Sequence, residues 1–301
     1  MTTDRETLST ALGPVGFWTF QLDAQSAARE RELVSEVEEL GFRAVWIPEG
    51  LGSKEAFAHA GILLSGTSQI VVATGIASIW ARDAMAMSNG SRALAEAYPG
   101  RFLLGMGVSH EPRAIERGHL WERPWSKMRA YLDAMDSAAA PKAVSPAPRV
   151  LAALGPKMLA LAAERAMGAH PYFVTVEHTA RAREILGPDK FLSPEQTVVL
   201  ETDPGEARAI ARKFMGNYLF LPNYSNNLRR MGWGEEDMAE PYSDRFVDAV
   251  VALGDVDAIR RRVEEHREAG ADHVTLQILG PEASEFPIRQ LRELAPALLT
   301  H

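Results

Sequence analysis

The chain has 301 residues and no cysteine, and its formal net charge is -8, from 32 Lys and Arg against 40 Asp and Glu. The acidic balance gives no general attraction to nucleic acid or to anionic membranes. The lack of cysteine excludes disulfides, thiol nucleophiles and thiolate metal sites, and it fits a reducing cytoplasm. The first ten residues are polar, and no run approaches the ~20 apolar residues of a membrane span. We therefore expect a cytoplasmic protein with no nucleic-acid or membrane partner.

Strand-like runs alternate with amphipathic helical segments along nearly the whole chain. The predicted strands comprise residues 15–22, 43–47, 69–76, 101–106, 150–154, 172–176, 197–201 and 273–279. The predicted helices comprise residues 23–40, 55–64, 83–98, 125–139, 157–167, 178–186, a segment that opens at 203, 255–269 and 287–299. Eight alternations favour an α/β fold that is a closed (β/α)8 barrel, or TIM barrel, over an open sheet.

Residues 217–253 are too many for a plain loop in such a barrel. We expect this insertion to pack helical segments over the barrel mouth. The chain shows no repeat, linker or low-complexity tract, so residues 1–301 are predicted to form a single domain.

The run from Arg149 to Leu159 combines a buried strand, a glycine turn and a helix that starts with proline. Gly155 permits a tight turn, and Pro156 suits the first helical position. The free amides up to Met158 lie at the positive end of the helix dipole, and Lys157 would add a full charge. The run predicts a phosphate site at residues 155–158, although strand-Gly-Pro-helix junctions also serve as plain connections in many α/β folds.

Four motifs occur in the order that one family would place them around a barrel. They are ELGFRAVWIPE at 39–49, TGIASIWAR at 74–82, GRFLLGMGV at 100–108, and LGPKML at 154–159 with GAHPY at 168–172. Together they resemble the luciferase-like monooxygenase superfamily, and within it the actinobacterial oxidoreductases that use the deazaflavin coenzyme F420. The resemblance covers nearly the whole chain. It implies a bacterial luciferase-type barrel that transfers a hydride between F420 and a small organic substrate, and we expect a homodimer.

The coenzyme ring is expected where the strands end, because the residues after barrel strands meet at one mouth. Gly75 and Ala77 would leave one face of a flat tricyclic ring free of side chains. Relatives bend this strand end with a non-proline cis peptide, which here would join Gly75 to Ile76; a plain glycine strand end is the alternative. The predicted coenzyme-binding residues are Gly75, Ile76, Ala77, Ser78, Gly107, Val108, Ser109, Gly155, Pro156, Lys157 and Met158.

Two residues are predicted to serve catalysis. Relatives that oxidise alcohols have an acid and then a histidine after the second strand, whereas this chain has Glu49 and then Gly50, which puts simple alcohol or sugar-phosphate oxidation in doubt. His110 follows the fourth strand, where some relatives have a catalytic carboxylate, and imidazole titrates near working pH. A loop histidine could equally be a surface or packing residue.

Aromatic residues suggest a substrate pocket. Several aromatic residues lie at or just after strand ends, and the set that could form the apolar wall is Trp18, Phe20, Trp80, Trp121 and Trp125, although aromatic side chains are more often core. Arg82 would bind an acidic substrate or the coenzyme tail, or pair with a nearby acid. The histidines show no metal-ligand spacing, so no metal is predicted.

Three functions stay open. The leading one is an F420-dependent oxidoreductase. The second is an FMN-dependent monooxygenase, in which the reduced flavin reacts with oxygen. The third is a non-catalytic flavin-binding relative.

Overall fold

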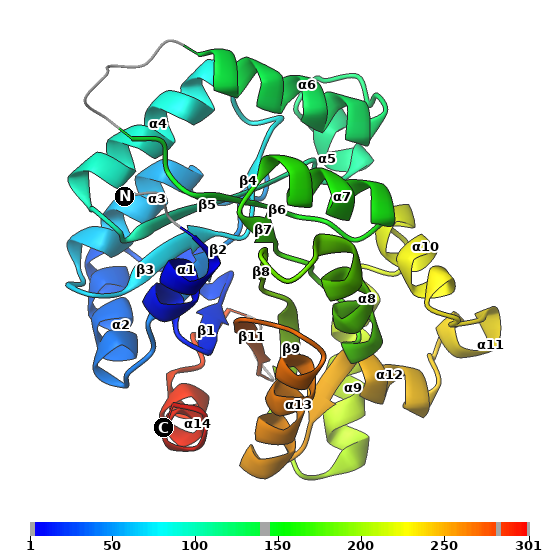
Figure 1. The fold of residues 1–301 in the computed structure, drawn as a ribbon. Helices are drawn as coiled ribbons and strands as arrows, with labels where there is room; N and C mark the ends of the chain where they lie inside the picture. Colours follow the sequence, from blue (N-terminus) through cyan, green and yellow to red (C-terminus); the bar gives the residue numbers. More distant parts are fainter. Residues whose placement is uncertain (1–3, 139–144, 281–283, 300–301) are drawn as a thin grey trace.

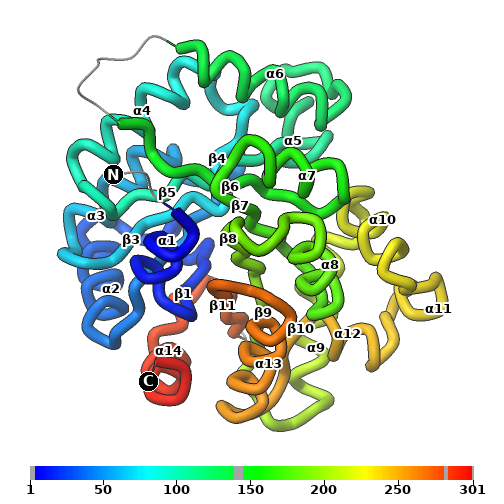
Figure 2. Tube along the Cα trace, in the orientation of Figure 1, coloured from blue at the N-terminus to red at the C-terminus, as the bar shows by residue number. Residues whose placement is uncertain are grey.

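The computed structural model describes residues 4–138, 145–280 and 284–299 (Figures 1 and 2). Its strands are β1 (Val15–Trp18), β2 (Ala44–Ile47), β3 (Val71–Thr74), β4 (Ala77–Ser78), β5 (Phe102–Gly107), β6 (Arg149–Leu151), β7 (Gly168–Ala169), β8 (Phe191–Leu192), β9 (Glu195–Val199), β10 (Val251–Leu253) and β11 (Val274–Leu279).

The helices begin with α1 (Arg5–Leu12), a 3-10 turn η1 (Gln21–Ala24), α2 (Ala27–Glu39), α3 (Ala56–Ser65), α4 (Ala84–Ala97), α5 (Glu111–Glu116) and α6 (Pro124–Ser137). They continue with α7 (Pro156–Arg165), α8 (Val176–Leu186), α9 (Pro204–Met215), α10 (Pro222–Arg230), α11 (Glu235–Met238), α12 (Asp244–Val250), α13 (Val256–Glu268) and α14 (Ile288–Leu298).

The strands form a parallel barrel surrounded by helices. Hydrogen-bonded neighbours run in the order β11, β1, β2, β3, β5, β6, β7 and β8, with β9 and then β10 on the other side of β11. In Figure 1 the helices α2, α3 and α4 cover one side of the strands, and α7, α8 and α13 cover the other. The predicted (β/α)8 barrel is confirmed.

Residues 191–199 close the barrel as one interrupted strand. The first part, β8, pairs with β7, and the second part, β9, pairs with β11. At the interruption, the Glu195 amide donates to the Pro171 carbonyl (2.8 Å), and the Thr275 amide donates to the Pro194 carbonyl (3.0 Å). Proline has no N–H to donate, so the ladder breaks at Pro194 and resumes one residue later.

The residues of β2 alternate between two parts of the hydrophobic core, one outside the barrel strands and one inside the barrel. All four of its residues are buried, as expected for a parallel strand covered on both faces. Val45 and Ile47 point to the layer between the strands and the helices, whereas Ala44 and Trp46 belong to the cluster inside the barrel. Inside the barrel, the Trp46 Nε1–H donates to His273 Nε2 at 3.2 Å. This alternation places every second strand residue on the barrel axis.

The sixth strand was predicted wrongly at residues 172–176. The structure has the strand at Gly168–Ala169, and Val176 already begins α8. Pro171 cannot continue a ladder, and Phe173 has a left-handed backbone with φ of 58°. The apolar residues that suggested a strand are instead a turn that carries Tyr172 to the barrel mouth.

Two other expectations need correction. The second helix begins at Ala27 rather than Asp23, because Ser26 is its N-cap and accepts from the Arg29 amide; Asp23 lies in η1. The insertion at 217–253 contains α10, α11 and α12 but also ends in β10, which pairs with β9. The predicted end of the helix at residue 139 lies outside the described residues.

Candidate active site

A cavity of about 1260 Å³ lies where the barrel strands end. Its lining comes from segments that follow several different strands, together with residues 210–230. Pockets for drug-sized ligands measure roughly 300–1,000 Å³, so this one has room for a coenzyme and a substrate together.

Many of the predicted site residues meet in this cavity. Those in its lining are Trp18, Phe20, Glu49, Gly75, Ile76, Ser78, Val108, Ser109, His110, Trp121, Gly155 and Met158. The predicted residues outside its lining are Ala77, Trp80, Arg82, Gly107, Trp125, Pro156 and Lys157. Ala77 is fully buried in the core, and Pro156 and Lys157 are exposed on the outer side of the α7 terminus.

The end of β3 forms a tightly held edge of the cavity. The Gly75–Ile76 peptide bond is cis, as the family resemblance implies. The Gly75 amide donates to the Ile47 carbonyl (2.7 Å), and the Gly75 carbonyl accepts from Trp18 Nε1–H (2.9 Å). A Cβ on Gly107 would lie 2.9 Å from the Ile76 side chain, so Gly107 lets Ile76 pack rather than contacting a ligand itself.

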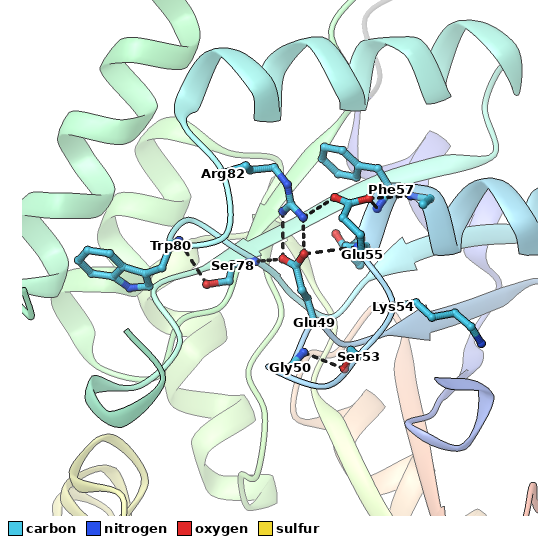
Figure 3. Close-up of polar contacts among 12 residues, drawn as sticks. Glu49, Gly50, Ser53, Lys54, Glu55, Phe57, Ser78, Trp80 and Arg82 are labelled. Carbon is cyan, nitrogen blue, oxygen red and sulfur yellow. Dashed lines mark hydrogen bonds and ion pairs between the residues drawn. The ribbon is translucent and has the colours of Figure 1, made fainter. Parts of the chain in front are cut away.

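Glu49 is held in a buried cluster of charges (Figure 3). Its Oε2 accepts from the Ser78 amide (2.8 Å) and from Arg82 Nη1 (3.0 Å), and its Oε1 pairs with Arg82 Nη2. The side chains of Glu49 and Arg82 are 3 % and 9 % exposed. Arg82 also pairs with the more exposed Glu55 at 2.5 Å. Of the three roles predicted for Arg82, this geometry matches pairing with nearby acids. Both carboxylate oxygens of Glu49 already accept hydrogen bonds, which leaves few lone pairs for proton transfer.

Trp80 packs away from the cavity, contrary to the prediction that it lines the substrate pocket. Its Nε1–H donates to the Val108 carbonyl (2.7 Å), and the Lys127 ammonium lies 5.1 Å from its ring centre. Figure 3 shows the Trp80 ring directed away from Arg82. Because the chain turns just after β4, Trp80 lines a separate cavity of about 470 Å³ beside α6.

Aromatic rings form a continuous wall in the main cavity. Phe20 contacts Trp18 edge-on, with 4.4 Å between ring centres, and Trp18 lies 5.1 Å from Tyr172. Tyr172 is 6.1 Å from Tyr224, whose ring is 5.3 Å from that of His110. The wall joins the end of β1 to the end of β5, and its apolar faces suit a flat ligand.

His110 enters this wall from the end of β5. Its Nδ1 lies 3.2 Å from Asn223 Oδ1, so Nδ1 carries the proton and donates, leaving Nε2 as an acceptor. Burial is the main influence on its titration and lowers the pKa of His110 below the ordinary 6.5. The imidazole is therefore neutral at pH 7, which suits a group that exchanges a proton with a ligand.

The turn at Gly155 meets a cation from the insertion. Gly155 is the N-cap of α7 and has no side chain to bond the first amides of the helix. A Cβ at Gly155 would lie 3.4 Å from Arg230 Nη2, and both residues line the cavity. From the sequence, Lys157 is predicted to supply the charge here. The structure instead brings Arg230 to the turn, while Lys157 is exposed outside the lining.

Several lining residues were not singled out from the sequence: Tyr218, Tyr224, Arg230 and Gln277. Tyr172, in the GAHPY motif, was expected at the mouth with the other strand-end residues, and it lines the cavity. Tyr218 and Tyr224 belong to the insertion, where the pattern indicated helices but not which face meets the barrel. Gln277 is a polar residue within an apolar strand, a signal that could have marked it.

Within residues 4–138, 145–280 and 284–299, no three His, Asp or Glu side chains are arranged to hold a metal ion. In the same part of the chain, no helix combines the length and the apolar character needed to cross a membrane.

A family model for luciferase-like monooxygenases matches residues 12–273. The chain belongs to this family. It is 26 % identical to a protein of Mycobacterium tuberculosis whose name provisionally assigns it as a coenzyme F420-dependent oxidoreductase, and the match covers 93 % of this chain and 96 % of that protein. An uncharacterised M. tuberculosis protein is also 26 % identical, over 82 % of this chain and 89 % of its own length.

Two solved structures share the fold of this chain. An F420-dependent secondary alcohol dehydrogenase in complex with an F420-acetone adduct superposes with a TM-score of 0.75 at 15 % identity, covering 95 % of this chain and 99 % of that one. The FMN-bound oxygenating constituent of 3,6-diketocamphane monooxygenase from Pseudomonas putida superposes with a TM-score of 0.67 at 15 % identity, covering 95 % and 98 %. This barrel is therefore found with both coenzymes.

Proposed function

We propose that this luciferase-like protein is an oxidoreductase that transfers a hydride between the deazaflavin coenzyme F420 and a small organic substrate. The observation that carries the proposal is the single cavity in which the end of β3, the aromatic wall and the Gly155 turn meet. The end of β3 and the aromatic wall suit the flat ring of such a coenzyme, and the Gly155 turn suits its phosphate.

The residues present fit that group. A Cβ at Gly75 would lie 2.6 Å from Trp18 Nε1, so the glycine lets the Trp18 ring pack here. The backbone of Gly75 and Ile76 lines the cavity, where it can contact a flat ring. At the N-terminus of α7, Pro156 has no N–H and Met158 donates to the Gly155 carbonyl (3.0 Å), so the Lys157 amide would contact a phosphate here. The Arg230 guanidinium adds a charge-assisted contact. Gly155 leaves the space between that helix terminus and Arg230 open.

The charges of the lining favour F420 over FMN. The cavity is lined by the cations Arg113, Arg117, Lys213 and Arg230 and by the acids Asp23, Glu49 and Glu116, of which Glu116 pairs with Arg113. Lys213 and Arg230 form no ion pair with any residue that the structure describes. FMN ends at its phosphate, whereas F420 continues into an acidic tail that could use these additional cations. The full-length likeness to a relative named for F420 supports the same choice.

When bound, the deazaflavin supplies hydride transfer at its C5. The residues of this chain bind and orient it and control protons nearby. Trp18 and Phe20 form one side of the cavity, and the neutral His110, fixed by Asn223, can take a proton at Nε2. Glu49, bonded to Arg82 and to the Ser78 amide, positions the end of β3 rather than transferring protons.

A fluorescence titration of ligand-free protein with F420 and, separately, with FMN tests the proposal. We expect the Kd for F420 to be at least about tenfold lower, with a salt dependence that the phosphate-free deazaflavin chromophore lacks, because screening weakens exposed charge contacts. Tighter binding of FMN would overturn the proposal. FMN binding with oxygen consumption would then indicate a monooxygenase, and FMN binding without turnover a non-catalytic relative.

A further inference from the structure

Two tyrosines and a glutamine form a chain of hydrogen bonds in the cavity. Tyr172 Oη lies 2.6 Å from Gln277 Oε1 and 2.8 Å from Tyr218 Oη. The three residues come from the turn after β7, from β11 and from the segment between α9 and α10, and all of them line the cavity. Nothing in the proposed function so far uses them.

The Tyr218 ring is fixed by aromatic neighbours. It stacks on Phe173 with ring centres 5.3 Å apart and an interplanar angle of 25°. Phe214 lies 4.9 Å away, and Tyr224 meets it edge-on at 5.5 Å. Held on several sides, the ring can place its hydroxyl at one defined point of the cavity, which is what orienting a ligand requires.

The hydrogen bonds that link Gln277, Tyr172 and Tyr218 can run in either of two directions. Each tyrosine hydroxyl has one proton. If Gln277 presents its oxygen, Tyr172 donates to it, Tyr218 donates to Tyr172, and the Tyr218 oxygen can only accept from a ligand. If Gln277 presents its nitrogen, every donor reverses, and the Tyr218 hydroxyl is free to donate to a ligand.

Both directions are open to Gln277. Among the described residues, its side-chain amide is hydrogen-bonded only to Tyr172, so no other contact fixes which amide atom faces Tyr172. Burial raises the pKa of Tyr218 and that of Tyr172 above the ordinary 10, so both hydroxyls keep their protons at neutral pH.

We propose that Tyr218 contacts the oxygen of the substrate, and that Tyr172 and Gln277 are positioning residues that let it accept from an alcohol or donate to a carbonyl. A group of this kind suits a neutral substrate whose oxygen alternates between those two states during hydride transfer. The inference rests on the proposed function. It also gives the site a contact for the substrate oxygen although Gly50 offers no side chain after Glu49.

The bond changes balance in the reducing direction. The carbonyl carbon gains a hydride from the reduced coenzyme of the proposed function, and the carbonyl oxygen gains the Tyr218 proton as the C=O π bond breaks. The coenzyme is oxidised and the ketone becomes an alcohol. The tyrosinate left on Tyr218 accepts from the Tyr172 hydroxyl, which accepts in turn from the Gln277 amide, and it regains a proton from solvent through the cavity mouth.

The test uses cyclohexanone labelled with ¹³C at its carbonyl, bound to coenzyme-free protein and observed by infrared difference spectroscopy. We expect the carbonyl stretch to move to lower frequency in the wild type, as it does for a hydrogen-bonded ketone. In Tyr218→Phe the stretch should return toward its unbonded position, and the affinity for cyclohexanone should fall about tenfold, as expected for one lost hydrogen bond.

Tyr224→Phe is the matched control, because Tyr224 lines the same cavity but its hydroxyl takes no part in the hydrogen bonds between Tyr218, Tyr172 and Gln277. It should keep the shifted stretch. Tyr172→Phe should keep the Tyr218 contact but broaden the band, because Tyr218 loses its orienting partner. Equal shifts in the wild type and Tyr218→Phe, or no binding of cyclohexanone by the wild type at millimolar concentration, would overturn the inference. The coenzyme titration tests the proposed function separately, so either result can fail alone.

Discussion

Glu49 Oε2 accepts a hydrogen bond from the Ser78 amide at 2.8 Å, and this contact joins the segment after β2 to β4, which follows β3 directly. The same carboxylate pairs with Arg82, which is itself buried. Glu49 therefore fixes the cavity edge that carries Gly75 and Ile76. Because both oxygens of Glu49 already accept hydrogen bonds, we expect this side chain to hold the cavity edge in place.

Glu49→Gln should lower the free energy of unfolding by about 3 kcal/mol, because it leaves the buried Arg82 guanidinium without its main counter-charge. Glu55→Gln is the matched control, since Glu55 pairs with the same guanidinium but its side chain is 51 % exposed. It should cost less than about 1 kcal/mol. Urea unfolding of both variants measures the difference, and equal losses would mean that Glu49 does not anchor this edge.

His110→Ala should lower turnover by about 10² while leaving coenzyme affinity nearly unchanged, the pattern of an interaction made mainly in the transition state. Asn223→Ala should have a smaller effect, because Asn223 only orients the His110 ring through Nδ1. Steady-state kinetics and coenzyme titrations on both variants check this. Unchanged turnover in His110→Ala would make His110 a packing residue of the aromatic wall.

Arg230→Glu should weaken binding of the coenzyme by roughly 1 to 3 kcal/mol, through the loss of a charge-assisted contact at the Gly155 turn. Lys157→Glu makes the same charge change on an exposed residue outside the cavity lining. It should change the Kd by no more than about threefold. Should Lys157→Glu prove the more damaging variant, the phosphate would lie on the outer side of α7.

Glu195 makes stability depend on pH. It is 1 % exposed and accepts from the Phe173 amide (3.0 Å) and the Thr197 hydroxyl (2.6 Å). Burial raises the pKa of Glu195 from 4.5 to about 7. Between these values the unfolded chain has lost the proton that the folded protein keeps, so stability falls as pH rises from 4.5 to about 7, by about 3 kcal/mol in total.

Glu195→Gln should remove that slope, because the amide cannot ionise and can still accept from the Phe173 N–H. Thermal or urea unfolding of both proteins across this range measures the difference. The buried histidines, including His170 and His273, are present in both proteins, so their contribution to the pH dependence of stability is the same in both. Parallel curves for the two proteins would show that Glu195 is ionised in the fold throughout this range.

The sequence predicts the elements that are defined by local pattern. The sequence predicts correctly the strands near 44–47, 71–74 and 102–107 and the helices that follow them. Each of these segments contains its own apolar periodicity and its own glycine or proline boundary. The strand β7 has only two residues, and Pro194 interrupts the strand that closes the barrel. Such features depend on pairing between distant segments, which a local pattern does not contain.

The candidate site divides in the same way. Residues that follow a strand directly, such as Gly75 and His110, reach the cavity as predicted. Trp80 lies only five residues after Gly75, but the turn after β4 directs its side chain into the smaller, separate cavity. Arg230 and Tyr218 come from the insertion, whose path over the barrel no strand end dictates.

The most direct measurement is a crystal structure of the protein with bound F420. We expect the deazaflavin ring against the backbone of Gly75 and Ile76, beside Trp18, with the phosphate at the N-terminus of α7 within hydrogen-bond reach of Arg230. The Tyr218 hydroxyl should face the space left for the substrate. A coenzyme found elsewhere on the barrel, or a phosphate away from the Gly155 turn, would contradict the central claim.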